Sequence, residues 1–167
     1  MGYTVSNDGN FLVFVWADFC ENDSAKTREQ FKNNLLGNIL VSLYPEVTYM
    51  NFKEMRNKHQ KKLEQQVTYN SHAYARETFN ADTVARFEIK MHGRKLHDKY
   101  QDNTVLMIQK SGRGVITLFC FYTKEGKKNL GTYMNAVENM LWFKEKIGSE
   151  GLDQIKIVPL KPGKIIN

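Results

Sequence analysis

The chain has 167 residues, which is enough for one domain with a substantial hydrophobic core. Hydrophobic residues make up 41% and aromatic residues 12% of the sequence, a composition that excludes an intrinsically disordered chain. The formal net charge of +6 favours an anionic partner such as nucleic acid. No stretch approaches the ~18 apolar residues that a membrane span needs, and the N-terminus lacks the pattern of a secretory signal. The sequence therefore predicts a cytoplasmic protein that does not enter a membrane.

The N-terminal half predicts a strand followed by a long helix. "FLVFVWADF" (11–19) is rich in β-branched and aromatic residues and follows the turn signal "SNDGN". Ser24 is expected to cap a helix that ends before Pro45. Apolar residues recur along this helix with helical spacing at Phe31, Leu35, Leu36, Ile39, Leu40 and Leu43. A short strand is expected over 47–50, and then a helix over 53–66 that is polar on nearly all sides, so it lies on the surface or contacts a charged group such as phosphate.

The C-terminal half predicts an antiparallel sheet. Residues 67–86 show no clear period and are expected to form a loop with a short helix. Apolar residues then alternate in "FEIKM" (87–91), "NTVLMIQK" (103–110) and "GVITLFCFYTK" (114–124), as in strands. The "SGRG" between the last two strands indicates a tight hairpin, and the last strand is apolar enough to be central and covered on both faces.

A second amphipathic helix is expected at about 129–147, closed by Gly148. Its apolar stripe comprises Leu130, Tyr133, Met134, Val137, Met140, Leu141 and Ile147. Residues 154–160 are expected to add an edge strand, where a proline is tolerated. These elements predict one α+β domain over 1–167, a mostly antiparallel sheet with helices packed on it and a sheet core at about 87–125.

Metal chemistry finds little support in the residue spacing. Cys20 and Cys120 lie in apolar runs and are expected to be buried, reduced thiols. The histidines show no ligand spacing, and no G-x-S-x-G motif supports a catalytic triad, so neither a metal nor a cofactor is expected. One alternative stays open. Glu88 and Lys90, on one face of a strand, could act with Asp82 in a Mg²⁺-dependent nuclease.

Metal-free chemistry on RNA suits the composition of the second half better. Cleavage next to a ribose 2′-hydroxyl needs a base, an acid, and cations that stabilise the phosphorane. If residues 94–100 are extended, Lys95, His97 and Lys99 share one face that could lie across a phosphate backbone. The alternative is a solvated edge strand whose lysines prevent aggregation.

The order of elements resembles the RelE-like superfamily of toxin ribonucleases. The similar stretch runs from "FEIKM" (87–91) through "TVLMIQKSGRGVITLFCFYTKEGKKNLGTYMNAVENML" (104–141). The resemblance implies cleavage of mRNA in the ribosome by cations on the sheet, with a tyrosine or histidine near the C-terminal helix. It matches Tyr133 of "YMNA" to the family's C-terminal tyrosine, Lys127 to the place of a catalytic arginine, and Lys90 to a basic residue of the first central strand.

The sequence thus predicts an RNA-directed protein, in one form a metal-independent endoribonuclease acting on mRNA or ribosomes. The candidate catalytic residues are His97 and Tyr133 for proton transfer and Lys127 for stabilising the transition state. The residues expected to bind nucleic acid are Lys90, Arg94, Lys95, Lys99, Arg113, Lys124 and Lys128. RNA or the ribosome is the expected partner, with an antitoxin as a protein partner. The alternative is a small non-enzymatic modulator, for example phage-encoded, that binds nucleic acid or a host protein.

Overall fold

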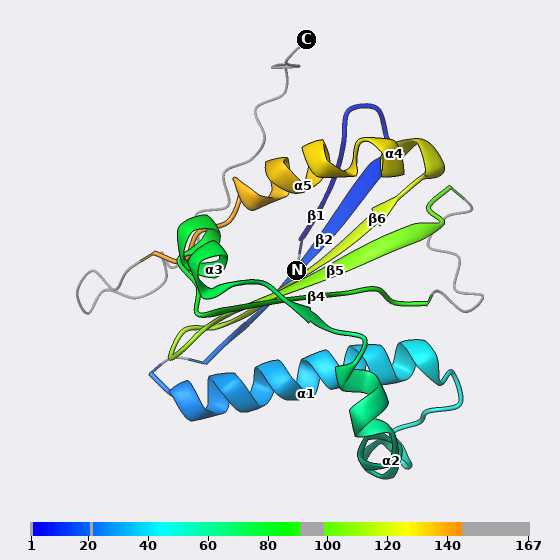
Figure 1. Cartoon of the computed structure of the whole chain (residues 1–167), viewed down its shortest axis with the longest axis vertical. Coiled ribbons are helices and arrows are strands. Elements are labelled where there is room, and N and C mark those ends of the chain that lie inside the picture. The colour runs from blue at the N-terminus through cyan, green and yellow to red at the C-terminus, as the bar shows by residue number, and fades with distance from the viewer. Residues whose placement is uncertain (1, 21, 91–98, 145–167) are drawn as a thin grey trace.

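The computed structural model describes residues 2–20, 22–90 and 99–144, which form an antiparallel sheet with helices on both faces (Figure 1). The 6-stranded sheet has the order β1-β2-β6-β5-β4-β3. Its strands are β1 (Gly2–Val5), β2 (Phe11–Phe19), β3 (Thr68–Tyr69), β4 (Thr83–Phe87), β5 (Asp102–Lys110) and β6 (Gly114–Tyr122). The helices are α1 (Ser24–Leu43), α2 (Phe52–Glu64), α3 (His72–Phe79), α4 (Lys124–Lys128) and α5 (Leu130–Glu138). The predicted α+β class is confirmed.

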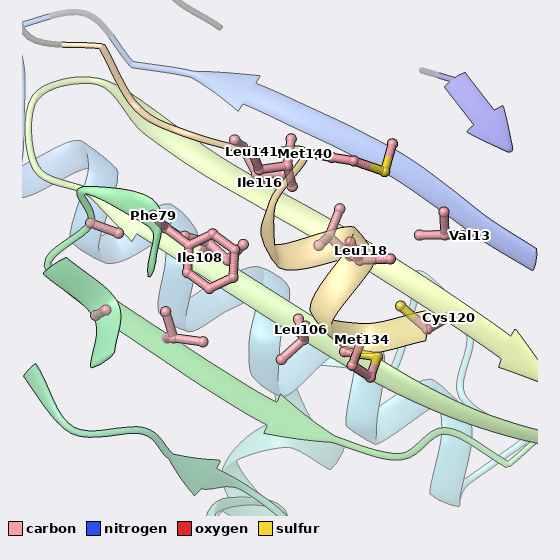
Figure 2. Packing of buried hydrophobic residues seen from close by; sticks show 14 of the residues in the cluster. Val13, Phe79, Leu106, Ile108, Ile116, Leu118, Cys120, Met134, Met140 and Leu141 are labelled. Atoms are coloured by element: carbon pink, nitrogen blue, oxygen red, sulfur yellow. The ribbon is translucent and has the colours of Figure 1, made fainter. Parts of the chain in front are cut away.

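Two hydrophobic clusters lie on opposite faces of this sheet, because successive side chains of a strand point to opposite sides. On the face covered by α1 and α2, the apolar stripe of α1 meets Ala85, Val105 and Met107. On the other face, α3 and α5 cover Leu106, Ile108, Ile116 and Leu118 (Figures 1 and 2). The strands β5 and β6 are therefore buried on both sides, which the apolar run of β6 had predicted for that strand.

The long helix α1 matches its prediction except at its first turn. Its apolar stripe is buried, and the helix ends at Leu43, before Pro45. The N-cap is Asp23, not Ser24, because the Asp23 carboxylate accepts a hydrogen bond of 2.7 Å from the backbone nitrogen of Lys26. Cys20, just before this helix, and Cys120 in β6 are buried and free, as predicted.

Several short elements differ from the predictions. Residues 47–50 form no strand: 47 and 48 are irregular and 49 and 50 lie in a turn. The Asn51 side chain accepts a hydrogen bond from the backbone nitrogen of Thr48. The segment 67–86 contains the expected short helix, α3, but β3 and most of β4 form where a loop was expected. The strand β4 ends at Phe87, where the sequence predicted its start, and β1 pairs with β2 without having been predicted.

The C-terminal helix α5 ends at Glu138, well before the predicted end at 147. Beyond it, Leu141 and Phe143 are buried without helical backbone. The backbone nitrogen of Phe143 donates to the carbonyl oxygen of Phe79 at 2.9 Å, and Asn80 Nδ2 donates to the Phe143 carbonyl at 2.6 Å. This tertiary contact draws the chain away from the helix axis. Residues 145–147 and the strand predicted at 154–160 lie outside the described residues.

Candidate nucleic-acid interface

Lysines from separate segments gather at one end of the sheet, where β2 and β5 begin and β4 and β6 end. We call this the basic end and define it by Lys90, Lys99, Lys124, Lys127 and Lys128, all of which are exposed. The Lys127 ammonium donates to Asp102 Oδ2, at the start of β5, at 3.1 Å. All of these lysines belong to the set that the sequence assigned to catalysis or to nucleic-acid binding.

Lys90 is held in place by hydrogen bonds of the backbone around it. The buried Asn103 side chain accepts from the backbone nitrogen of Ile89 at 2.8 Å and donates to the Ile89 carbonyl at 2.6 Å. The backbone nitrogen of Lys90 also donates to the Ser42 hydroxyl near the end of α1. Although residues 88–90 lie beyond β4, they are therefore tied to β5 on one side and to α1 on the other.

The short helix α4 carries Lys124 and Lys128 against the turn between β1 and β2. Thr123 caps this helix by accepting from the Gly126 nitrogen at 2.9 Å, and its hydroxyl donates to Asn10 Oδ1 at 3.0 Å. A Cβ at Gly126 would collide with the Asn10 carbonyl oxygen, so this close approach requires glycine. The ammonium of Lys99 lies beside Gly9 in the same turn.

The charge of Lys127 is partly balanced by its neighbours. Its hydrogen bond to Asp102, and then the charge of that carboxylate, raise the pKa of Lys127 above its ordinary value, so the ammonium stays protonated. Glu88 adds a smaller effect in the same direction. Within the described part of the chain, Lys90, Lys99, Lys124 and Lys128 form no ion pair, which leaves their charges available to an anionic ligand.

Tyr133 has a clear packing role. Its ring stacks on Phe11 with centroids 4.9 Å apart, and its hydroxyl donates to Asp8 Oδ2 at 2.5 Å. Burial, followed by the hydrogen bond to Asp8, raises the pKa of Tyr133. The Tyr133 hydroxyl therefore keeps its proton at neutral pH. Its hydrogen bond to Asp8 holds α5 against the turn between β1 and β2.

Asp8 makes this fastening sensitive to acid. Partial burial acts to raise the pKa of Asp8, but hydrogen bonds from Ser6, Tyr133 and Asn10 together outweigh it and hold the pKa well below its ordinary value. A carboxyl group with a lowered folded-state pKa stabilises the fold above its unfolded pKa of about 4, and this stabilisation is lost as the pH falls towards the folded value.

We therefore expect the difference in melting temperature between the wild type and Asp8→Asn to be largest near neutral pH. It should shrink steadily below about pH 4, because the wild-type carboxylate becomes protonated. Calorimetry or circular dichroism between pH 7 and pH 2 measures it, with Tyr133→Phe as the variant that removes only the donor. A difference that stays constant over this range would contradict the assigned role of Asp8.

One of the predicted residues, Arg113, is not brought to the basic end. Arg113 lies at the opposite end of the sheet, in the turn between β5 and β6, where its guanidinium donates to the Lys144 carbonyl at 3.0 Å. Arg94, Lys95 and His97 lie outside the described residues. Their expected roles stay predictions.

The alternative Mg²⁺ site is wrong. Asp82 and Glu88 flank opposite ends of β4, about 20 Å apart at ~3.3 Å per residue, which is too far for a shared ion. Asp82 instead accepts from the Ser111 nitrogen at 2.7 Å and lies 3.7 Å from the Lys110 ammonium. No group of three or more potential metal ligands occurs in residues 2–20, 22–90 and 99–144.

A groove that the sequence did not reveal lies beside Lys90. The helix α1 packs over β5 and β6 and leaves the adjoining part of β2 open, which creates a space of about 890 Å³. Its floor comprises Phe14, Trp16, Thr117, Phe119 and Phe121. Its helical wall comprises Gln30, Asn33, Asn34, Gly37, Asn38 and Val41. This wall is a second stripe of α1 with helical spacing, and that spacing of amides was the signal available in the sequence.

Comparison with protein-family models finds no matching family, and searches of curated proteins and of solved structures find no match either. The resemblance to RelE-like ribonucleases accordingly stays a prediction. Among the helices of the described residues, none is long and apolar enough to cross a membrane.

Proposed function

We propose that this chain is an RNA-directed protein that binds the phosphate backbone through the basic end. The observation that carries the proposal is the position of five exposed lysines from separate segments at one end of the sheet: Lys90, Lys99, Lys124, Lys127 and Lys128. Lysine ammonium groups neutralise phosphates and release condensed counterions, which supplies most of the affinity of sequence-independent binding. The excess of 24 basic over 18 acidic residues supports the same kind of partner.

Binding is supported better than cleavage. The hydroxyl of Tyr133 and the ammonium of Lys127 are each engaged by a carboxylate, Asp8 and Asp102 respectively. A general base must be able to take a proton, and the raised pKa of Tyr133 works against that role. An endoribonuclease is therefore the narrower form of the proposal, with His97 and Lys127 as its candidate residues and the ribosome as its candidate setting.

The proposal predicts that Lys124→Ala/Lys128→Ala weakens binding of a labelled single-stranded RNA about tenfold near physiological salt. It should also make the dependence of log K on log salt shallower by about 0.7 for each phosphate that the variant no longer neutralises. Fluorescence anisotropy at several salt concentrations measures both quantities. The matched control is Lys26→Ala/Lys32→Ala, which removes the same charge from exposed positions of α1.

Equal reductions in affinity in the two double variants would contradict a role for the basic end, and wild-type protein that binds no RNA would overturn the proposal. Gel analysis of the same RNA, and of mRNA on translating ribosomes, with and without EDTA, tests cleavage. EDTA-resistant cleavage that disappears in Lys127→Ala and His97→Ala would support the endoribonuclease form. RNA that is bound and recovered intact would leave a binding protein.

A further inference from the structure

We infer that the groove between α1 and the strands β2 and β6 is a base-binding site, which takes unstacked bases of the single-stranded RNA held at the basic end. The inference rests on the proposed function. It adds a site for the bases of the RNA, whereas the lysines of the basic end bind its phosphates. Lys90 belongs to both surfaces, because it lines the groove and is one of the lysines of the basic end. A backbone crossing the basic end therefore passes the mouth of the groove.

The floor of the groove offers aromatic faces. Trp16 is 48% exposed in the middle of β2, and its indole nitrogen donates to Asp18 Oδ1 at 2.9 Å, which fixes the ring. Phe14 lies between Tyr3, at 5.7 Å between ring centroids, and Phe121, at 6.0 Å. Bases of any sequence stack on such rings, and each stacked base contributes about five- to 150-fold in affinity (~1–3 kcal/mol).

The wall of the groove offers hydrogen-bonding groups for base edges. Asn34 Nδ2 donates to Asp18 Oδ2 at 2.9 Å, and Asn33 Oδ1 accepts from the Arg56 guanidinium at 2.7 Å. These contacts hold two amides in defined orientations, while the Asn38 side chain forms no hydrogen bond within the described residues. Asn and Gln side chains present a donor and an acceptor side by side, as the edges of bases do.

The chemistry of the lining favours RNA over a protein helix or strand as the occupant. A groove for an apolar peptide face offers few hydrogen-bonding side chains, whereas the helical wall here carries four amides, Gln30, Asn33, Asn34 and Asn38, beside its apolar floor. The combination of aromatic faces with amides and a lysine at the mouth matches the bases and phosphate of a single strand. Its volume of about 890 Å³ lies within the range of ~300–1,000 Å³ for ligand sites.

The test uses the fluorescence of Trp16. The chain has 2 Trp, and Trp142, 47% exposed, does not line the groove, so Trp142→Phe leaves Trp16 as the sole indole. We expect a five-nucleotide oligoadenylate to quench this emission, because adenine stacks on the ring. Polyphosphate of the same length, which carries the charge without bases, should bind the basic end without quenching.

Affinity supplies the second measurement. Trp16→Ala should weaken oligoadenylate binding about tenfold, in the range expected for one stacked base, and leave polyphosphate binding unchanged. Trp16→Phe keeps an aromatic face and should retain most of the affinity. Trp142→Ala is the matched control, since it removes an equally exposed indole outside the groove.

The outcomes separate this inference from the proposed function. Oligoadenylate that binds without quenching Trp16, and equally well in Trp16→Ala, would overturn the base-binding site and leave the basic end intact. No binding of either oligoadenylate or polyphosphate would overturn both. Association of two copies in sedimentation, abolished in Trp16→Ala and not displaced by oligoadenylate, would assign the groove to a second copy and overturn the inference.

Discussion

Leu40→Ala is expected to lower the free energy of unfolding by about 2–5 kcal/mol. Leu40 belongs to the apolar stripe of α1, near the C-terminal end of the helix, and has 0% exposure. The substitution removes buried methyl groups and leaves a cavity between the helix and the sheet, which the surrounding side chains fill only in part. Urea denaturation followed by circular dichroism measures the change.

The neighbouring Val41→Ala is the matched control. Val41 belongs to the same helix but faces the groove and is 37% exposed, so its truncation should cost less than about 1 kcal/mol. Equal destabilisation of Leu40→Ala and Val41→Ala would show that α1 does not pack on the sheet through the stripe that contains Leu40. The pair therefore tests which stripe of the helix is core and which is groove wall.

These two stripes show what the sequence could and could not predict about α1. The apolar stripe was predicted because burial of a helix face follows directly from apolar spacing. The amide stripe, which includes Asn34 and Asn38, has the spacing of an ordinary solvated face. It becomes a groove wall only because β2 pairs beyond β6 and lies outside the cover of α1, and the spacing of the amides by itself does not distinguish a groove wall from a solvated face.

How well the strands of the sheet were predicted also depended on whether the evidence for them lies within one short segment of the sequence. The hairpin of β5 and β6 was predicted because its turn glycines and alternating strands lie within one short segment. The two-residue strand β3 and the strand β1 are too short to show a period, and the partner of β2 is about a hundred residues away in sequence. The end of α5 was missed because the periodic residues Met140 and Leu141 stay buried after the helix has stopped.

For the candidate site, the sequence predicted residue types better than their surroundings. Lys127 and Tyr133 were identified as chemically suitable side chains, but their carboxylate partners, Asp102 and Asp8, come from other segments. Such pairs follow from tertiary structure and cannot be read from spacing. They change the expected chemistry, since a tyrosine that donates to a carboxylate is a poor general base.

The connection between the groove and the basic end depends on Asn103, and Asn103→Ala tests it. The substitution leaves the backbone nitrogen and carbonyl of Ile89 without their side-chain partner. At about 1–3 kcal/mol for each of the two partly buried groups left unpaired, we expect a decrease of about 2–6 kcal/mol in the free energy of unfolding. Asn103→Asp keeps the acceptor but turns a carboxylate oxygen towards the Ile89 carbonyl at a buried position, so at neutral pH it should be destabilised at least as much as Asn103→Ala.

Asn103→Ala is also expected to weaken RNA binding, separately from its effect on stability. Once the Asn103 side chain is removed, residues 88–90 lose their tie to β5 and keep, among the described residues, only the hydrogen bond from the Lys90 nitrogen to Ser42. Lys90 is then held less firmly, so RNA affinity should fall even at temperatures where the variant is folded. Hydrogen exchange of the Ile89 amide reports the local change, and urea denaturation reports the global one. Gln101→Ala, at an exposed position just before β5, is the control and should alter neither.

Unchanged protection of the Ile89 amide in Asn103→Ala would show that Lys90 is positioned by other contacts, and the continuity of the groove with the basic end would then have no structural basis.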